Sequence, residues 1–124
     1  HFSKDPDFVD SWPVHCVAES HGAAMHEAIG PTQAYFRKGE YTAAYSGFEG
    51  AANGTLLAEW LREQGIESVD IVGIATDHCV RATAADALQE GFTVRVLRDY
   101  CSPVDESRGE AALEELAAAG ATIC

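Results

Sequence analysis

The stretch VDIVGIATDHCVRATAADALQEGFTVRVLRD, residues 69–99, decides the fold class. Residues 69–75 form a β-branched, apolar run that is typical of a strand buried on both faces. Apolar residues at helical spacing follow and stop at Gly91, and residues 92–99 are again rich in β-branched side chains. This alternation with short joints predicts a parallel sheet whose strands are connected by crossover helices.

The same pattern extends to both sides of this stretch. Apolar residues recur at helical spacing after Thr55, which is predicted to cap a helix that ends at Gly65. The other predicted elements are a short helix at 22–28, a strand at 33–39, a helix at 106–119 stopped by Gly120, and the start of a strand at 121–124.

The composition limits the classes of partner. The chain has 124 residues, of which 47% are hydrophobic, and this fits a single domain with a real core. Eight basic and twenty acidic residues give a net charge of −12, which disfavours nucleic acid and anionic lipid as partners. No apolar run is long enough to span a bilayer. The four cysteines lack CxxC spacing, so we expect reduced thiols and a cytoplasmic protein.

Cys79 lies where the strand 69–75 passes into the following helix. Unpaired backbone N–H groups and the positive end of the helix dipole favour a thiolate there, and the same N–H groups suit an oxyanion on a substrate. A buried structural cysteine is the alternative, and the position alone does not decide between the two. Ligands of parallel sheets bind at the carboxyl ends of strands, where Lys38, TDHC (76–79) and DYCSP (99–103) fall.

The neighbours of Cys79 are given other roles. Asp77 is predicted to be the N-cap of the helix. Successive helical residues point roughly 100° apart, so His78 does not face Cys79 and is expected to line the pocket or order the turn. Lys38 is the candidate cation that holds a thiolate in place, with an ordinary solvated lysine as the alternative. His1 and His15 are candidate metal ligands, although two histidines make an incomplete site.

Three blocks in this order resemble motifs of the nicotinamidase/pyrazinamidase family, within the isochorismatase-like cysteine hydrolases. They are HFSKDPDFVDSWPVHC (1–16), FRKGEYTAAYSGFEG (36–50) and VDIVGIATDHCVRATAADAL (69–88). The resemblance covers nearly the whole chain. It implies an α/β fold with a doubly wound parallel sheet and helices on both faces, represented here without its first strand.

The resemblance also implies roles for individual residues. Cys79 matches the nucleophile and Lys38 the lysine of the catalytic triad. Ile74 and Ala75 match a pair joined by a non-proline cis peptide, through which the Ala75 N–H joins that of Cys79 in the oxyanion hole. The implied substrate-pocket residues are Trp12, Tyr45, Ile74 and His78, and the implied metal ligands are His1 and His15.

The family's triad aspartate, and an aspartate and a histidine of its metal shell, precede the position that matches His1. We therefore expect residues 1–124 to be the C-terminal portion of one isochorismatase-like domain, with the preceding portion of the same protein as a necessary partner. The chain also opens on a histidine instead of a methionine. A polypeptide of these residues alone is expected to be inactive and poorly folded.

The implied activity is hydrolysis of nicotinamide to nicotinate and ammonia, as in NAD salvage, and of pyrazinamide to pyrazinoate, through a thioester on Cys79. The implied cofactor is one divalent transition metal (iron, zinc or manganese), the substrate is a small carboxamide, and a homo-oligomer is left open. One alternative is another amidase of the superfamily that acts on an N-carbamoyl or ureido compound, against which the pair His1 and His15 argues. A non-catalytic metal-binding fragment is the second alternative.

Overall fold

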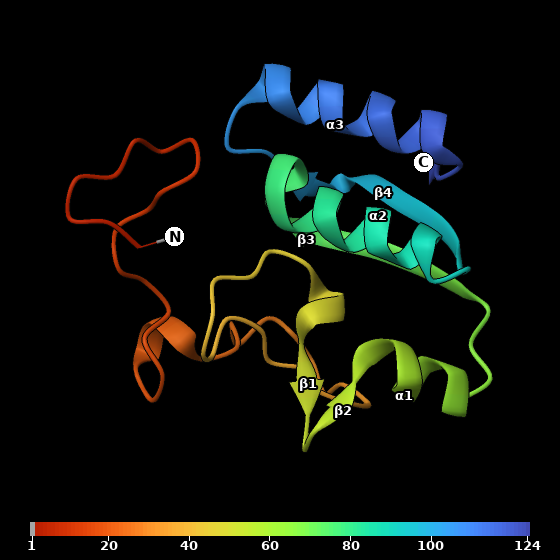
Figure 1. Cartoon of the computed structure of the whole chain (residues 1–124), viewed down its shortest axis with the longest axis horizontal. Coiled ribbons are helices and arrows are strands. Elements are labelled where there is room, and N and C mark those ends of the chain that lie inside the picture. The colour runs from red at the N-terminus through yellow and green to blue at the C-terminus, as the bar shows by residue number, and fades with distance from the viewer. Residues whose placement is uncertain (1) are drawn as a thin grey trace. The chain divides into compact units, whose positions relative to one another are not determined.

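The computed structural model describes residues 2–124, which divide into two compact units: the described part of His1–Gln33, and Ala34–Cys124 (Figure 1). The elements in chain order are 3₁₀ turns at His21–Ala23 and Gly47–Glu49, β1 (Ala51–Ala52), β2 (Thr55–Leu56), α1 (Leu57–Glu63), β3 (Ser68–Ile74), a π-helical turn at Thr76–Val80, α2 (Arg81–Gln89), β4 (Thr93–Ser102), α3 (Glu106–Ala119) and β5 (Thr122–Ile123).

The second unit is built on a three-stranded sheet in the order β3-β4-β5, and both strand pairs are parallel. α2 connects β3 to β4 and α3 connects β4 to β5. The predicted parallel sheet with crossover helices is therefore confirmed. The register of β3 against β4 shifts between Ile71 and Gly73, because Ile71 pairs with Val96 whereas Gly73 pairs with Cys101. This bulge bends the carboxyl end of β4, where the chain turns toward α3.

α3 forms at Glu106–Ala119, the range that the sequence predicts. Alanine, leucine and glutamate give it high helix propensity, and the Asp105 side chain accepts a hydrogen bond from the Arg108 N–H as the N-cap. Gly120 ends the helix with a φ of +114°, a conformation that glycine adopts at no steric cost. Within residues 2–124, no helix has the length and apolarity that crossing a membrane requires.

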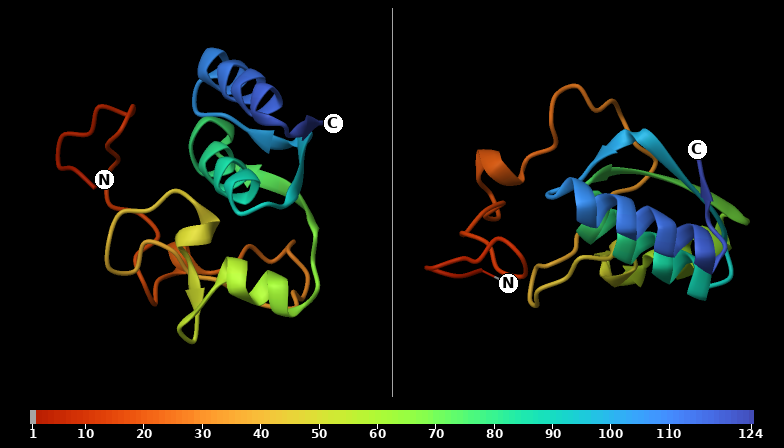
Figure 2. Two further views of the ribbon diagram at one scale, coloured as in Figure 1. Left: turned by 45° about the vertical axis from the view of Figure 1, so that its right-hand side comes forward. Right: turned by 90° about the horizontal axis from the view of Figure 1, so that it is seen from above.

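The core lies on one face of the sheet, where α2 and α3 pack against each other and against the strands (Figure 2). Its buried side chains come from one strand and two helices: Val94 and Val96 from β4, Ala84 and Ala87 from α2, and Leu113 and Leu116 from α3.

The opposite face of β3 is exposed, which corrects the prediction of a strand buried on both faces. Val72 is 53% exposed and Ile74 75% exposed, whereas their neighbours Val69 and Ile71 pack against the core. Alternate residues of a strand point to opposite faces, and the two crossover helices cover only the face of Val69 and Ile71.

The segment before the sheet differs from the prediction in two places. The strand expected at 33–39 is absent, because only Arg37 finds a strand partner, in one antiparallel bridge to Ala51. Thr55 does not cap α1: it pairs with Ala52 in the short β1–β2 hairpin, and Leu56 occupies the N-cap position without a side-chain hydrogen bond. One bridge does not make residues 33–39 a strand, whereas at Thr55 the hairpin pairing overrides the capping pattern. Gly65 follows α1 with a φ of +71°, as predicted.

The first unit consists mainly of turns. Phe2 and Trp12 form a parallel bridge, and the Asp7 carboxylate accepts the N–H groups of Val9, Asp10 and Ser11. The predicted helix at 22–28 is reduced to the 3₁₀ turn His21–Ala23, because every residue of this segment is exposed and no packing stabilises a longer helix.

Candidate functional site

Cys79 lies in the π-helical turn Thr76–Val80, called here the reactive turn, which joins β3 to α2. The Ile74–Ala75 peptide bond just before it is cis. The Ala75 carbonyl accepts hydrogen bonds from two residues of the turn, the His78 N–H at 3.1 Å and the Val80 N–H at 3.0 Å. The second of these spans five residues, which is the spacing of a π-helix and a feature found frequently at functional sites.

Lys38 contacts the cysteine directly. Its Nζ lies 2.9 Å from the Cys79 Sγ, across 41 residues of sequence, and also donates to the Tyr45 carbonyl oxygen. Both side chains are half-buried. An ammonium group at this distance stabilises a thiolate, and limited water access strengthens the interaction. The sequence resemblance placed these two residues in one site, and the structure brings them together.

Tyr45 and His78 form one wall beside this pair. Their rings stack with centroids 5.2 Å apart at an interplanar angle of 40°. The segment that carries Tyr45 is anchored behind the ring, since Ser46 is buried and forms a capping box with Glu49, and the Gly47 N–H donates to the Thr83 hydroxyl of α2 at 2.9 Å. Capping and anchoring hold the backbone of Tyr45 in a fixed position relative to α2.

Asp77 is not the N-cap of the turn, which corrects the prediction. Ala75 occupies the cap position and makes no side-chain hydrogen bond there. The carboxylate of Asp77 instead accepts the Val104 N–H at 2.9 Å and the Asp105 N–H at 3.3 Å, both in the loop before α3. A residue that caps its own helix has to lie just before the first position of the turn, whereas Asp77 lies within the turn and its side chain is buried.

The same carboxylate has an arginine and a histidine as neighbours. Its Oδ2 lies 3.4 Å from the Arg108 Nε and 3.9 Å from the His78 Nε2. Burial by itself would raise the pKa of Asp77, but hydrogen bonds from the N–H groups of Val104, Asp77 itself and Asp105, together with the charge of His78, hold that pKa below its usual range. Asp77 therefore stays ionised at neutral pH.

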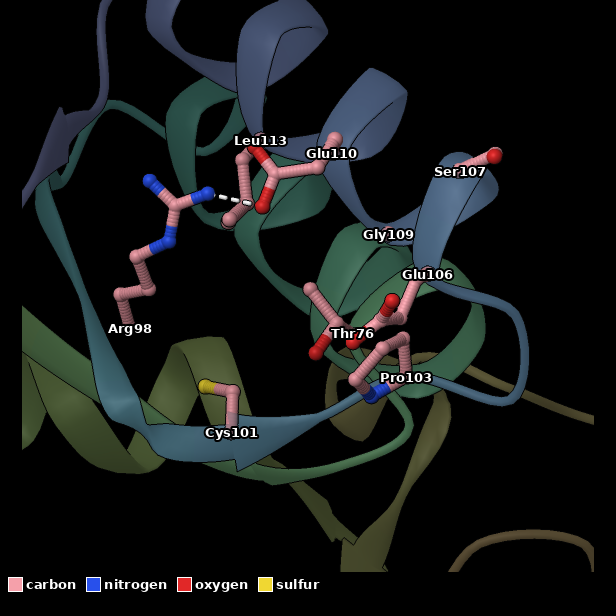
Figure 3. A pocket seen from close by; sticks show the side chains of 9 residues that line it. All are labelled: Thr76, Arg98, Cys101, Pro103, Glu106, Ser107, Gly109, Glu110 and Leu113. Carbon is pink, nitrogen blue, oxygen red and sulfur yellow. Dashed lines mark hydrogen bonds and ion pairs between the residues drawn. The ribbon is translucent and has the colours of Figure 1, made fainter.

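A cavity of about 510 Å³ lies beside the reactive turn, between β4 and α3 (Figure 3). Its lining residues are Thr76, Arg98, Cys101, Pro103, Glu106, Ser107, Gly109, Glu110 and Leu113. Thr76 is the only lining residue that belongs to the reactive turn, and neither Cys79 nor Lys38 lines the cavity. Burial raises the pKa of the Cys101 thiol that faces it, so this cysteine is a poor nucleophile at neutral pH.

The predicted metal ligands belong to the first unit. His1 lies outside the described residues. The exposed His15 has its Nδ1 2.6 Å from the Pro13 carbonyl oxygen, the contact that fixes the tautomer of a ligating histidine and gives the lone pair to Nε2. The chemistry of His15 thus fits a transition metal, but residues 2–124 gather no group of three or more histidine, cysteine or acidic ligands.

The other predicted site residues divide between the units. Trp12 is half-buried in the first unit, with its ring edge-on to Phe8 at 6.2 Å. Ile74 and Ala75 lie in the second unit at the end of β3, where the Ile74 side chain is exposed. The structure therefore assembles Cys79, Lys38, Tyr45, His78, Ile74 and Ala75 within one unit.

Two features of the site were missed from the sequence. The capping box of Ser46 and Glu49 has the S-x-x-E spacing that signals such a cap, so SGFE (46–49) could have predicted it. The contacts of Asp77 with Val104, Asp105 and Arg108 span 27 residues or more and have no local signal.

Comparisons with known proteins agree with this geometry. The isochorismatase domain profile matches residues 2–124. The nicotinamidase/pyrazinamidase of Mycobacterium tuberculosis is 50% identical over 126 residues, which cover 99% of this chain and 68% of that protein. The structure of the pyrazinamidase of Pyrococcus horikoshii in complex with zinc is similar with a TM-score of 0.73 and 39% identity, over 91% of this chain and 62% of that one.

A further solved structure, PnC1 from L. infantum in complex with nicotinate, has a TM-score of 0.81 and 36% identity. The similarity covers 91% of this chain and 60% of that one, so the chain spans less than two thirds of each of the two solved relatives. The resemblance seen in the three sequence blocks is confirmed by these relatives. From the match to its domain profile and the identity to its members, the chain belongs to the isochorismatase family.

Proposed function

We propose that this protein is a nicotinamidase that hydrolyses nicotinamide to nicotinate and ammonia, and pyrazinamide to pyrazinoate, through a thioester on Cys79. The observation that carries the proposal is the 2.9 Å contact between the Lys38 Nζ and the Cys79 Sγ in the turn after β3. The 50% identity to a nicotinamidase/pyrazinamidase supports the choice of substrate.

The first half of the reaction forms the acyl-enzyme. The thiol proton of Cys79 passes to a carboxylate base, which the family resemblance assigns to an aspartate outside these 124 residues. The Sγ electron pair attacks the carboxamide carbon, and the carbonyl electrons move to oxygen, where the N–H groups of Ala75 and Cys79 are proposed to bind the oxyanion. The C–N bond then breaks, and the amide nitrogen takes the proton from the acid and leaves as ammonia.

The second half returns the enzyme to its starting state. Water gives a proton to the same base and attacks the thioester carbon, and the C–S bond breaks with its electron pair returning to the Cys79 sulfur. The thiolate takes the proton back from the acid, and the carboxylic acid product loses its proton to solvent and leaves as nicotinate. Lys38 compensates the negative charge on sulfur at the start and at the end of the cycle, because its ammonium group contacts that atom.

The substrate ring is proposed to lie against the stacked rings of Tyr45 and His78, with Trp12 and Ile74 as further pocket residues. His15 and His1 are proposed to bind one divalent transition metal, and the zinc in the related pyrazinamidase supports this type of cofactor. When bound, the metal supplies a Lewis-acidic site that holds and orients the ring.

The test is ammonia release from nicotinamide by the full-length protein, with Cys79→Ala as the decisive variant. We expect kcat to fall at least about a thousandfold, because the thioester can no longer form. Cys124→Ala is the matched control, since Cys124 is an exposed free cysteine that follows β5. Retained turnover in Cys79→Ala would refute the mechanism, and turnover of an N-carbamoyl or ureido compound in place of nicotinamide would refute the substrate.

A further inference from the structure

Asp77 lies two residues before the proposed nucleophile and connects the reactive turn to the start of α3. Its carboxylate accepts two backbone N–H groups, those of Val104 and Asp105, and faces the Arg108 guanidinium at 3.4 Å. The side chain is 3% exposed, which makes it the most buried carboxylate among the ion pairs of the described residues. A buried carboxylate of this kind is retained only where several donors compensate it.

The loop 103–105, which donates these N–H groups, is itself held in place. A Cβ added to Gly109 of α3 would lie 2.6 Å from the Pro103 Cβ and 3.9 Å from the Thr76 Cβ, so the helix, the loop and the reactive turn are in close contact here. Asp105 also caps α3 through the Arg108 N–H. Figure 3 shows Thr76, Pro103 and Gly109 next to one another at this junction. The donors to Asp77 thus belong to a segment that is packed against α3 and close to the reactive turn.

The contacts of Asp77 also reach the proposed substrate wall. The His78 Nε2 is 3.9 Å from the Asp77 Oδ2, and the His78 ring contacts the ring of Tyr45 in a tilted arrangement. Asp77 therefore adjoins both the backbone that carries Cys79 and a ring proposed to contact the substrate. The positions of this backbone and this ring affect the rate, because a displacement of about 1 Å in a reacting group can lower a rate about a hundredfold.

Proton transfer by Asp77 is excluded by its surroundings. Its oxygens accept two backbone N–H groups and lie 3.4 Å from a guanidinium nitrogen, and these groups compensate its charge, which would otherwise oppose a thiolate two residues away. The carboxylate is thereby directed toward α3, and its effect on the reaction has to pass through the backbone of the turn and through His78.

We propose that Asp77 is a positioning residue of the amidase, which fixes the reactive turn against the loop 103–105 so that Cys79 and its N–H face the substrate carbonyl. This inference rests on the proposed function. It predicts that replacing Asp77 lowers kcat per folded molecule, in addition to any loss of folding stability.

The experiment compares Asp77→Asn, Asp77→Ala and Arg108→Gln with wild type in the full-length protein, well below the melting temperature and normalised to the folded fraction from circular dichroism. We expect kcat on nicotinamide to fall about 10- to 100-fold in Asp77→Asn, further in Asp77→Ala, and only a few-fold in Arg108→Gln, with little change in KM. Asn has nearly the volume of Asp and keeps one acceptor oxygen, so the loss of kcat in Asp77→Asn reports the changed hydrogen bonds and charge and not a change in side-chain volume.

Asp70→Asn is the control, because Asp70 also forms an ion pair with an arginine, Arg95, but lies on the exposed face of β3. It is expected to leave kcat unchanged. A wild-type kcat per folded molecule in Asp77→Asn and Asp77→Ala would overturn the inference, as would equal losses in Asp70→Asn.

A second measurement separates this inference from the proposed function. If wild type does not hydrolyse nicotinamide, the proposed function fails, and the rate of Cys79 alkylation by iodoacetamide, followed by peptide mass spectrometry, then tests the positioning. A slower rate at Cys79 in folded Asp77→Asn, with unchanged rates at the exposed Cys16 and Cys124, would support the role of Asp77. An unchanged rate at Cys79 would overturn it.

Discussion

Replacing Lys38 by methionine removes the positive charge beside Cys79 and keeps a side chain of similar length. The Nζ–Sγ distance of 2.9 Å corresponds to an attraction of about 6 kcal/mol between unit charges at an effective dielectric constant of about 20. Desolvation and ordering of the lysine side chain oppose this attraction, and hydrogen bonds to charged groups contribute a net of about 1.5–3 kcal/mol. We therefore expect the reactivity of Cys79 to fall about 10- to 150-fold in Lys38→Met.

The assay is the second-order rate of Cys79 alkylation by iodoacetamide at neutral pH, read by mass spectrometry of the Cys79 peptide, together with kcat on nicotinamide. Lys4→Met is the control, since Lys4 is exposed and lies in the first unit. Lys38→Arg keeps the charge and is expected to recover part of the rate. If Cys79 in folded Lys38→Met is alkylated at the wild-type rate, the electrostatic reasoning is refuted.

Two more predictions concern the junction of α3 with the reactive turn. In Gly109→Ala the new Cβ would lie 2.6 Å from the Pro103 Cβ, so we expect the free energy of unfolding to fall by about 1–3 kcal/mol. Urea denaturation measures this loss, and an unchanged midpoint would contradict the close packing. The lowered pKa of Asp77 means that its ionised form stabilises the fold above its ordinary pKa of 3.8 and that this contribution disappears as the pH falls through the lowered value. The difference in unfolding free energy between wild type and Asp77→Asn should accordingly be full at pH 7 and shrink in acid, and a pH-independent difference would contradict the assignment.

The elements that could be predicted from the sequence are those whose local signals and tertiary contacts agree. The helix Glu106–Ala119 has strong propensity, a cap at Asp105 and a stop at Gly120, and its apolar stripe meets the core. The strand predicted at 33–39 is absent because Arg37 alone finds a strand partner there, the distant Ala51. The Thr55 cap was wrong because Thr55 pairs with Ala52 in a hairpin, for which the Asn53-Gly54 turn is a local signal. Local patterns contain no information on which distant segment supplies the partner.

The candidate site also contains one feature that the sequence predicted and one that it did not. A motif resemblance was enough to associate Cys79 with Lys38, although 41 residues separate them. The side chain of Asp77 was assigned wrongly because its spacing also suits a helix cap, and only the three-dimensional position of the loop before α3 shows which donors it uses.

The distance in sequence between Asp77 and its donors has a consequence for biosynthesis. The Val104 N–H comes 27 residues after Asp77, so a nascent chain exposes its reactive cysteine before the supporting loop has been translated. Domains acquire long-range contacts only when both segments have emerged, and the thiol of a growing chain is therefore held less firmly than that of the finished one. A product that terminates before Pro103 would keep Lys38 and Cys79 but lack the donors, so the proposed nucleophile is supported only once residues 103–105 have been translated.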